Sequence, residues 1–97
     1  MSHRIEVGCR AEGTRLVCSV VVGVDSGATH HEVTVSRDLL AELRPGAGAP
    51  DGLVRDSFTL LLEREPRESI LRSFDLPLIG RYFAEWEAKI REPRAGS

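Results

Sequence analysis

The sequence predicts a single α+β domain: a three-stranded antiparallel meander followed by about four helices packed on one face of the sheet. Two observations predict this class. Residues 4–36 alternate apolar and polar side chains around two glycine-containing turn signals, which is typical of hairpins. Residues 37–91 carry apolar side chains at helical spacing, interrupted by prolines. A sheet with one apolar face needs a covering layer, and these helices can supply it.

Three strands are expected, at residues 4–10, 15–24 and 29–35. With Glu12-Gly13 and Ser26-Gly27 as two-residue turns, Val20 pairs with both Ile5 and Val33. Because side chains alternate between faces, one face is then apolar. It collects Ile5, Val7, Cys9, Leu16, Cys18, Val20, Val33 and Val35. The opposite face is mixed, and it places Arg10 opposite Arg15, which is an unfavourable pair.

The same register bears on the two cysteines. Cys9 is expected opposite Leu16, which makes Cys18 its diagonal neighbour at about 7–8 Å. That separation is near or beyond the Cα limit of about 7 Å for a disulfide. In a reducing compartment we therefore expect two buried free thiols.

Capping residues and prolines delimit the first two helices. Ser36 is a good N-cap for a short helix that Pro45-Gly46 ends. Pro50 and Asp51 suit the first turn of a second helix, which ends before Pro66. This second helix has the widest apolar arc in the chain, so it is expected to be the best buried.

The C-terminal third is expected to hold two more helices. A short one is predicted from Glu68 to Phe74, and a last one begins after an N-cap at Asp75 and runs to about Arg91. Its apolar stripe contains Ile79, Tyr82, Phe83, Trp86 and Ile90. Residues 1–91 are expected to form the domain, and residues 92–97 a disordered tail.

Composition argues against several classes of partner. The 97 residues include 13 basic and 15 acidic side chains, so the net charge is −2. A net charge this small gives no overall electrostatic attraction to nucleic acid or to a membrane surface. The N-terminal residues lack the apolar run of a signal peptide, and no segment reaches the roughly 20 apolar residues of a membrane span. A cytoplasmic protein that binds neither nucleic acid nor membrane is expected.

No residue pattern predicts catalysis, a cofactor or a metal. His30 and Glu32 point to one face of a strand and His31 to the other, so the three cannot share an ion. We expect these histidines at the fraying end of the sheet. The serines lack a nucleophile-elbow pattern, and acidic pairs such as Glu63/Glu65 do not face each other on a helix. An enzyme is not expected.

Apolar side chains without an assigned cover indicate where a partner could bind. Val17 and Val21 lie on the mixed sheet face, and Tyr82 and Trp86 lie on the last amphipathic helix. The aromatic side chains of that helix are expected mainly in the core, and they form a docking site if part of the stripe is exposed. These four residues are the candidate interaction surface. The predicted function is a small non-enzymatic protein-interaction or accessory domain, which acts through an unknown protein partner or through self-association as a homodimer.

Two stretches resemble known proteins. VTVSRDLLAEL at residues 33–43, followed by PDGLVRDSFTLLLERE at residues 50–65, is similar to the strand and two helices of ribbon-helix-helix DNA-binding proteins. That resemblance implies strand pairing across a dimer, with Glu32, Thr34 and Ser36 facing the major groove, and an alternative function as a DNA-binding regulator. ESILRSFDL at residues 68–76, followed by IGRYF at residues 79–83, resembles the C-terminal signature of short bacterial proteins of unknown function. It implies a stand-alone bacterial domain.

Overall fold

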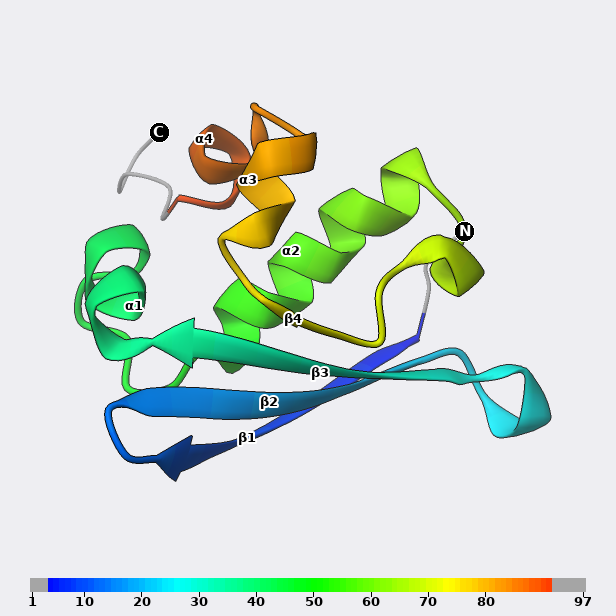
Figure 1. The fold of residues 1–97 in the computed structure, drawn as a ribbon, viewed down its shortest axis with the longest axis horizontal. Helices are drawn as coiled ribbons and strands as arrows, with labels where there is room; N and C mark the ends of the chain where they lie inside the picture. Colours follow the sequence, from blue (N-terminus) through cyan, green and yellow to red (C-terminus); the bar gives the residue numbers. More distant parts are fainter. Residues whose placement is uncertain (1–3, 92–97) are drawn as a thin grey trace.

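The computed structural model describes residues 4–91, in which a four-stranded mixed sheet and four α-helices form an α+β fold (Figure 1). The expected class is confirmed. The expected sheet is corrected, because it has a fourth strand and is not all antiparallel. The predicted tail at residues 92–97 lies outside the described residues. The elements are β1 (Ile5–Glu12), β2 (Arg15–Val22), β3 (Thr29–Ser36), α1 (Arg37–Leu43), α2 (Asp51–Arg64), β4 (Ser73–Asp75), α3 (Leu78–Tyr82) and α4 (Trp86–Ile90).

Both hairpins have the predicted faces but different registers. Gly13 and Thr14 form the first turn, with Gly13 at a φ of 64° that favours glycine. Glu12 then opposes Arg15, and the expected Arg10–Arg15 repulsion is absent. The second connection is a longer loop that contains a 3₁₀ turn at Asp25–Gly27. Each register differs from the predicted one by two residues, so the apolar face stays the same.

The register change overturns the prediction for the cysteines. Cys9 lies directly opposite Cys18, with a Cα–Cα distance of 4.0 Å, and the two form a disulfide. The expected free thiols are therefore wrong. The physical reason is the turn: moving it by one residue brings a diagonal pair into direct opposition. Disulfides persist mainly in oxidising compartments, so this bond bears against the premise of a reducing environment.

The first two helices begin where their capping residues predict. The hydroxyl oxygen of Ser36 accepts a hydrogen bond from the Leu39 N–H at 3.0 Å, which confirms the N-cap of α1. α2 begins at Asp51, directly after Pro50, and ends two residues before Pro66. It carries the fully buried Phe58, in agreement with the expected wide apolar arc.

The C-terminal third differs most from expectation. The helix predicted from Glu68 to Phe74 is instead a 3₁₀ turn at Arg67–Ser69 followed by β4. β4 pairs in parallel with β3, and backbone bonds join Glu32 N–H to the Arg72 carbonyl at 2.7 Å and Leu76 N–H to the Thr34 carbonyl at 2.9 Å. Without β4, the backbone N–H and C=O groups on this side of β3 would be unpaired. Pairing with them gives the backbone of residues 72–76 hydrogen-bond partners outside its own segment.

The last predicted helix is split into α3 and α4, with the break at residues 83–85. Asp75 does not cap a helix, because its carboxylate accepts a hydrogen bond from the Thr34 hydroxyl. The break lets Trp86 turn inward, where its indole Nε1–H donates to the Ser57 hydroxyl at 2.9 Å. Tertiary contacts therefore override the helical periodicity of this stretch.

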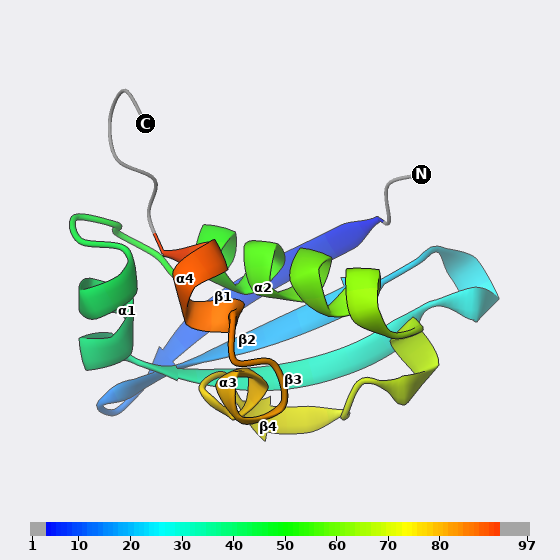
Figure 2. The ribbon, with the colours of Figure 1, turned by 90° about the horizontal axis from the view of Figure 1, so that it is seen from above.

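The four α-helices lie on one side of the sheet (Figures 1 and 2). Apolar side chains of β2 and β3 meet those of all four helices in one core. The core includes Val20, Val33, Leu43, Phe58, Ile79, Trp86 and Ile90. Among residues 4–91, no helix has the length and apolar character needed to cross a bilayer.

Candidate apolar binding site

A cavity of about 200 Å³ opens between the C-terminal end of α2 and the segment from residue 69 to residue 83. Its walls are largely apolar. The wall includes Leu61 from α2, Ile70 and Leu71 from the segment before β4, Phe74 from β4, and Tyr82 and Phe83 at the end of α3. Glu65 and Ser69 add polar groups. An apolar concave site with a few polar groups is the usual form of a binding site.

Two of the wall residues are large apolar side chains that face solvent. Leu71 is 50% exposed and Tyr82 is 68% exposed. Within residues 4–91, Val24 is the third large hydrophobic side chain with such exposure, and it does not line the cavity. Exposed apolar side chains are common singly, but two beside one apolar cavity indicate a surface for binding.

His31 holds the cavity wall to the sheet. Its Nδ1 donates to the Leu71 carbonyl at 2.7 Å, because a carbonyl oxygen can only accept. Its Nε2 lies 2.9 Å from the Thr29 hydroxyl. The imidazole is buried and lies against Phe58, with ring centroids 5.3 Å apart. Leu71 is thereby held at its carbonyl while its side chain stays exposed.

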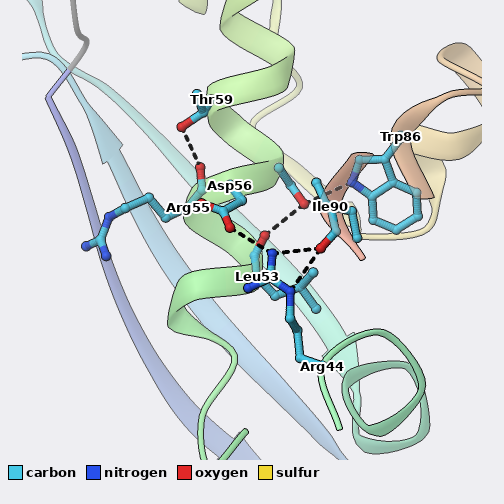
Figure 3. Close-up of polar contacts among 8 residues, drawn as sticks. Arg44, Leu53, Arg55, Asp56, Thr59, Trp86 and Ile90 are labelled. Carbon is cyan, nitrogen blue, oxygen red and sulfur yellow. Dashed lines mark hydrogen bonds and ion pairs between the residues drawn. The ribbon is translucent and has the colours of Figure 1, made fainter. Parts of the chain in front are cut away.

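A second set of contacts fixes α4 against α2 (Figure 3). The guanidinium of Arg44 donates to the Ile90 carbonyl from Nε at 2.9 Å and from Nη2 at 2.7 Å. The same Nη2 binds the Asp56 carboxylate at 2.7 Å. Arg44 therefore satisfies a carbonyl at the C-terminal end of α4, a place where cations are favoured.

Ser57 connects the same two helices in the core. Its hydroxyl donates to the Leu53 carbonyl at 2.9 Å and accepts from Trp86 Nε1, so its O–H donor and one of its acceptor lone pairs are used within the fold. Gly80 permits this packing, since a Cβ at that position would lie 3.2 Å from Trp86 Cε3. These contacts are structural, and they set the position of α3 beside the cavity.

The structure separates the four residues of the candidate interaction surface. Val17 and Val21 lie on the sheet face away from the helices, where Val17 is only 3% exposed and Val21 is half-buried. Val17 is flanked in register by Arg10 and Thr34. Trp86 is 3% exposed and belongs to the core, whereas Tyr82 is exposed beside the cavity. The four residues do not form one surface.

Sequence reasoning did not identify Leu71 or Glu65 as part of a site. One signal could have found Leu71. In ESILRSFDL, Ile70, Phe74 and Leu76 fit the alternation of a strand that is buried on one side, and Leu71 is the apolar residue that does not fit. Glu65 has no comparable signal, because acidic side chains at helix ends are ordinary.

The histidine pattern is partly as predicted. His30 and Glu32 are exposed and His31 faces the core, as the alternation requires. The expected position at a fraying end is wrong for His31, because the Leu71 carbonyl and Phe58 enclose it. Across residues 4–91, no group of three His, Cys, Asp or Glu side chains is placed to hold a metal ion.

No protein-family model, curated protein or solved structure shows significant similarity to this chain.

Proposed function

We propose that this chain is a small protein-interaction domain whose cavity receives one large apolar side chain of a protein partner. The observation that carries the proposal is the cavity itself, with exposed Leu71 and Tyr82 at its border. Its volume of about 200 Å³ lies below the roughly 300–1,000 Å³ of sites for drug-sized ligands. It is instead comparable to cavities of about 150 Å³ that accept a benzene ring.

An aromatic anchor next to a hydrogen-bond donor is the partner chemistry that fits best. Aromatic side chains dominate the energetics of protein interfaces when they fill a pocket. The Glu65 carboxylate in the wall has no hydrogen bond or ion pair to any other residue in the described range 4–91. An indole N–H or a neighbouring cationic side chain would give it a partner.

The alternative function as a DNA-binding regulator stays a prediction. The resemblance to ribbon-helix-helix proteins requires the third strand to pair with its copy. Here β3 pairs with β2 on one side and with β4 on the other, so residues 32–34 have no open edge. No observation on this strand favours DNA. The cytoplasmic location also stays a prediction, and the Cys9–Cys18 disulfide is the observation that bears against it.

The proposal can be tested with N-acetyl-tryptophanamide as a probe in an NMR titration. We expect saturable amide shifts around Leu71, Phe74 and Tyr82, with a dissociation constant of ~1 mM, as suits a fragment of this size. Leu71→Glu should weaken binding because it places a charge at the border of the cavity. Val24→Glu is the matched control, since Val24 is equally exposed but does not line the cavity.

The titration shows whether the cavity binds an aromatic side chain. Saturable shifts that Leu71→Glu weakens and Val24→Glu leaves unchanged support the proposal. Shifts that are absent at millimolar probe, or spread over the sheet, contradict it. Thermal unfolding of both variants checks that the fold is unchanged, as expected for substitutions at exposed positions.

A further inference from the structure

β1 is an edge strand whose outer side pairs with no other strand within residues 4–91. The strand order is β1-β2-β3-β4, and β4 lies at the opposite edge (Figure 1). A free edge of eight residues presents unpaired backbone groups that can add another strand. Its inner-face side chains Ile5, Val7 and Cys9 are only partly buried, so the core is incomplete at this edge.

The pairing of β1 with β2 determines which backbone groups face outward. Glu12 and Arg15 close the two-residue turn, and the Gly23 N–H bonds to the Arg4 carbonyl at 2.8 Å. Even-numbered residues of β1 therefore direct their N–H and C=O groups to β2. Odd-numbered residues direct theirs to the open edge. The Ile5 carbonyl agrees with this, since Arg55 Nε lies 3.5 Å from it.

The side chains of β1 on the sheet face away from the helices are self-complementary in charge. From Arg4, directly before β1, the residues on this face are Arg4, Glu6, Gly8, Arg10 and Glu12, with Gly8 at the centre. If a second β1 pairs antiparallel with Gly8 opposite Gly8, Arg4 faces Glu12 and Glu6 faces Arg10. Opposite charges in direct opposition stabilise a strand pair, and like charges destabilise it.

Other registers are disfavoured. A slip of two residues in one direction places Arg4 opposite Arg10, and in the other direction places Glu6 opposite Glu12. After a slip of one residue, backbone groups that point to the open edge would face residues whose N–H and C=O groups are already bonded to β2. Within the chain, Arg4 already binds Glu6 at 2.9 Å and Arg10 binds Glu12 at 2.8 Å. The Gly8 register would extend these pairs into two groups of four alternating charges.

We propose that β1 is a homodimerisation edge, and that two copies pair antiparallel about Gly8 into one continuous sheet. Ile5, Val7, Cys9 and Ala11 would then exchange about eight backbone hydrogen bonds across the twofold axis. Arg55 would leave the Ile5 carbonyl to the N–H of the partner's Ala11. The space beside Gly8 is open, because a Cβ there would have no heavy atom within 4 Å.

This interface goes beyond the proposed partner cavity, and it differs from the homodimer expected through Val17 and Val21. The cavity lies in the helix layer, which covers one face of the sheet (Figures 1 and 2). Ile5, Val7 and Cys9 face that layer, so by alternation the charged residues of β1 lie on the opposite face. Failure of either proposal therefore leaves the other intact. Exposed ion pairs add little affinity, but like charges in an interface are strongly disfavoured. The charges are expected to select the register, and the backbone bonds and inner-face contacts to supply the affinity.

A charge-exchange experiment tests the pairing on the full oxidised chain. By sedimentation equilibrium without reductant, the wild type should shift with concentration from 10.7 kDa toward twice that mass. Glu6→Arg places two Arg–Arg pairs across the axis, and Arg10→Glu places two Glu–Glu pairs. Each variant alone should dimerise at least about tenfold more weakly. Mixed one to one, the two variants should form a heterodimer, because every facing pair is then opposite in charge.

The outcomes are decisive because Glu6 and Arg10 are exposed and their substitution leaves the core untouched. Glu32→Arg is the matched control, an exposed charge reversal on β3 away from the open edge, and it should dimerise like the wild type. A wild type that stays monomeric at millimolar concentration overturns the proposal. So do single variants that dimerise normally, or a mixture that stays monomeric.

Discussion

The N-terminal sheet and the C-terminal third of this molecule are specified in different ways. In β1, β2 and β3, each strand pairs with its neighbour in the sequence, and the period-two pattern alone predicts which side chains face the helices. From residue 66 onward, β4, α3 and α4 are three to five residues long. Elements this short do not form on their own.

The contacts that hold the C-terminal third come from distant parts of the chain. His31 binds the Leu71 carbonyl, 40 residues away. Arg44 binds the Ile90 carbonyl, 46 residues away. Trp86 bonds to Ser57, 29 residues away. The region with the candidate binding cavity therefore takes its structure from contacts with the sheet, Arg44 and α2. It should be the first part to open when those supports are weakened.

Phe58 joins the two regions, so its truncation should destabilise the protein more than any other change considered below. Phe58 is fully buried in α2 and its ring contacts both His31 on β3 and Phe74 on β4. Phe58→Ala should reduce the free energy of unfolding by about 3–5 kcal/mol, through lost burial and a cavity. Urea denaturation measures the change. A loss below about 1 kcal/mol, no larger than for the exposed control Val24→Ala, would show that the two regions do not share this support.

The second effect concerns the N-terminal sheet alone. The disulfide closes a loop with a sequence separation of 9 across β1 and β2. Replacing both cysteines by alanine should reduce stability by about 2–3 kcal/mol, mainly because the unfolded chain regains freedom. Hydrogen exchange should accelerate in β1 more than in α3. If exchange instead accelerated first around the cavity, the disulfide would support the C-terminal third, and the two regions would not open independently.

The N-terminal sheet is predictable from the sequence to a greater extent than the C-terminal third. Alternation placed Val20, Val33 and Val35 on the buried face correctly, because a register error of two residues does not change faces. It did not find the disulfide, since that depends on the position of Gly13 in the turn. Ser36 and Pro50 located two helix starts from local chemistry alone.

The candidate binding cavity was beyond prediction for a physical reason. Its wall depends on β4, and three residues are too few to show a period. Residues 68–91 do carry apolar side chains at helical spacing. They form no continuous helix, because β4 pairs with β3 and Trp86 bonds to Ser57. The aromatic stripe of the last helix is expected mainly in the core; Trp86 satisfies its N–H there, whereas Tyr82 is exposed.

A third effect should be confined to the C-terminal third. His31→Leu keeps a large buried side chain but leaves the Leu71 carbonyl without its donor, so stability should fall by about 1–3 kcal/mol. Hydrogen exchange should accelerate at residues 72–76 with little change in β1. Thr29→Val is the control, since it removes only the hydroxyl beside Nε2 and should have a smaller effect. Equal acceleration in β1 would argue against independent opening of this region.

The smallest change in stability is expected at a helix start that depends on local contacts alone. Ser36 supplies the N-cap of α1, a seven-residue helix that follows β3 directly. Ser36→Ala should reduce the free energy of unfolding by about 1 kcal/mol, because the Leu39 N–H loses its acceptor. Ser36→Asp keeps an acceptor at the same position and should retain wild-type stability in the same urea titration. If both variants lost the same stability, the hydroxyl would matter for its packing and not as a cap. The start of α1 would then depend on tertiary contacts, as the short elements after residue 66 do.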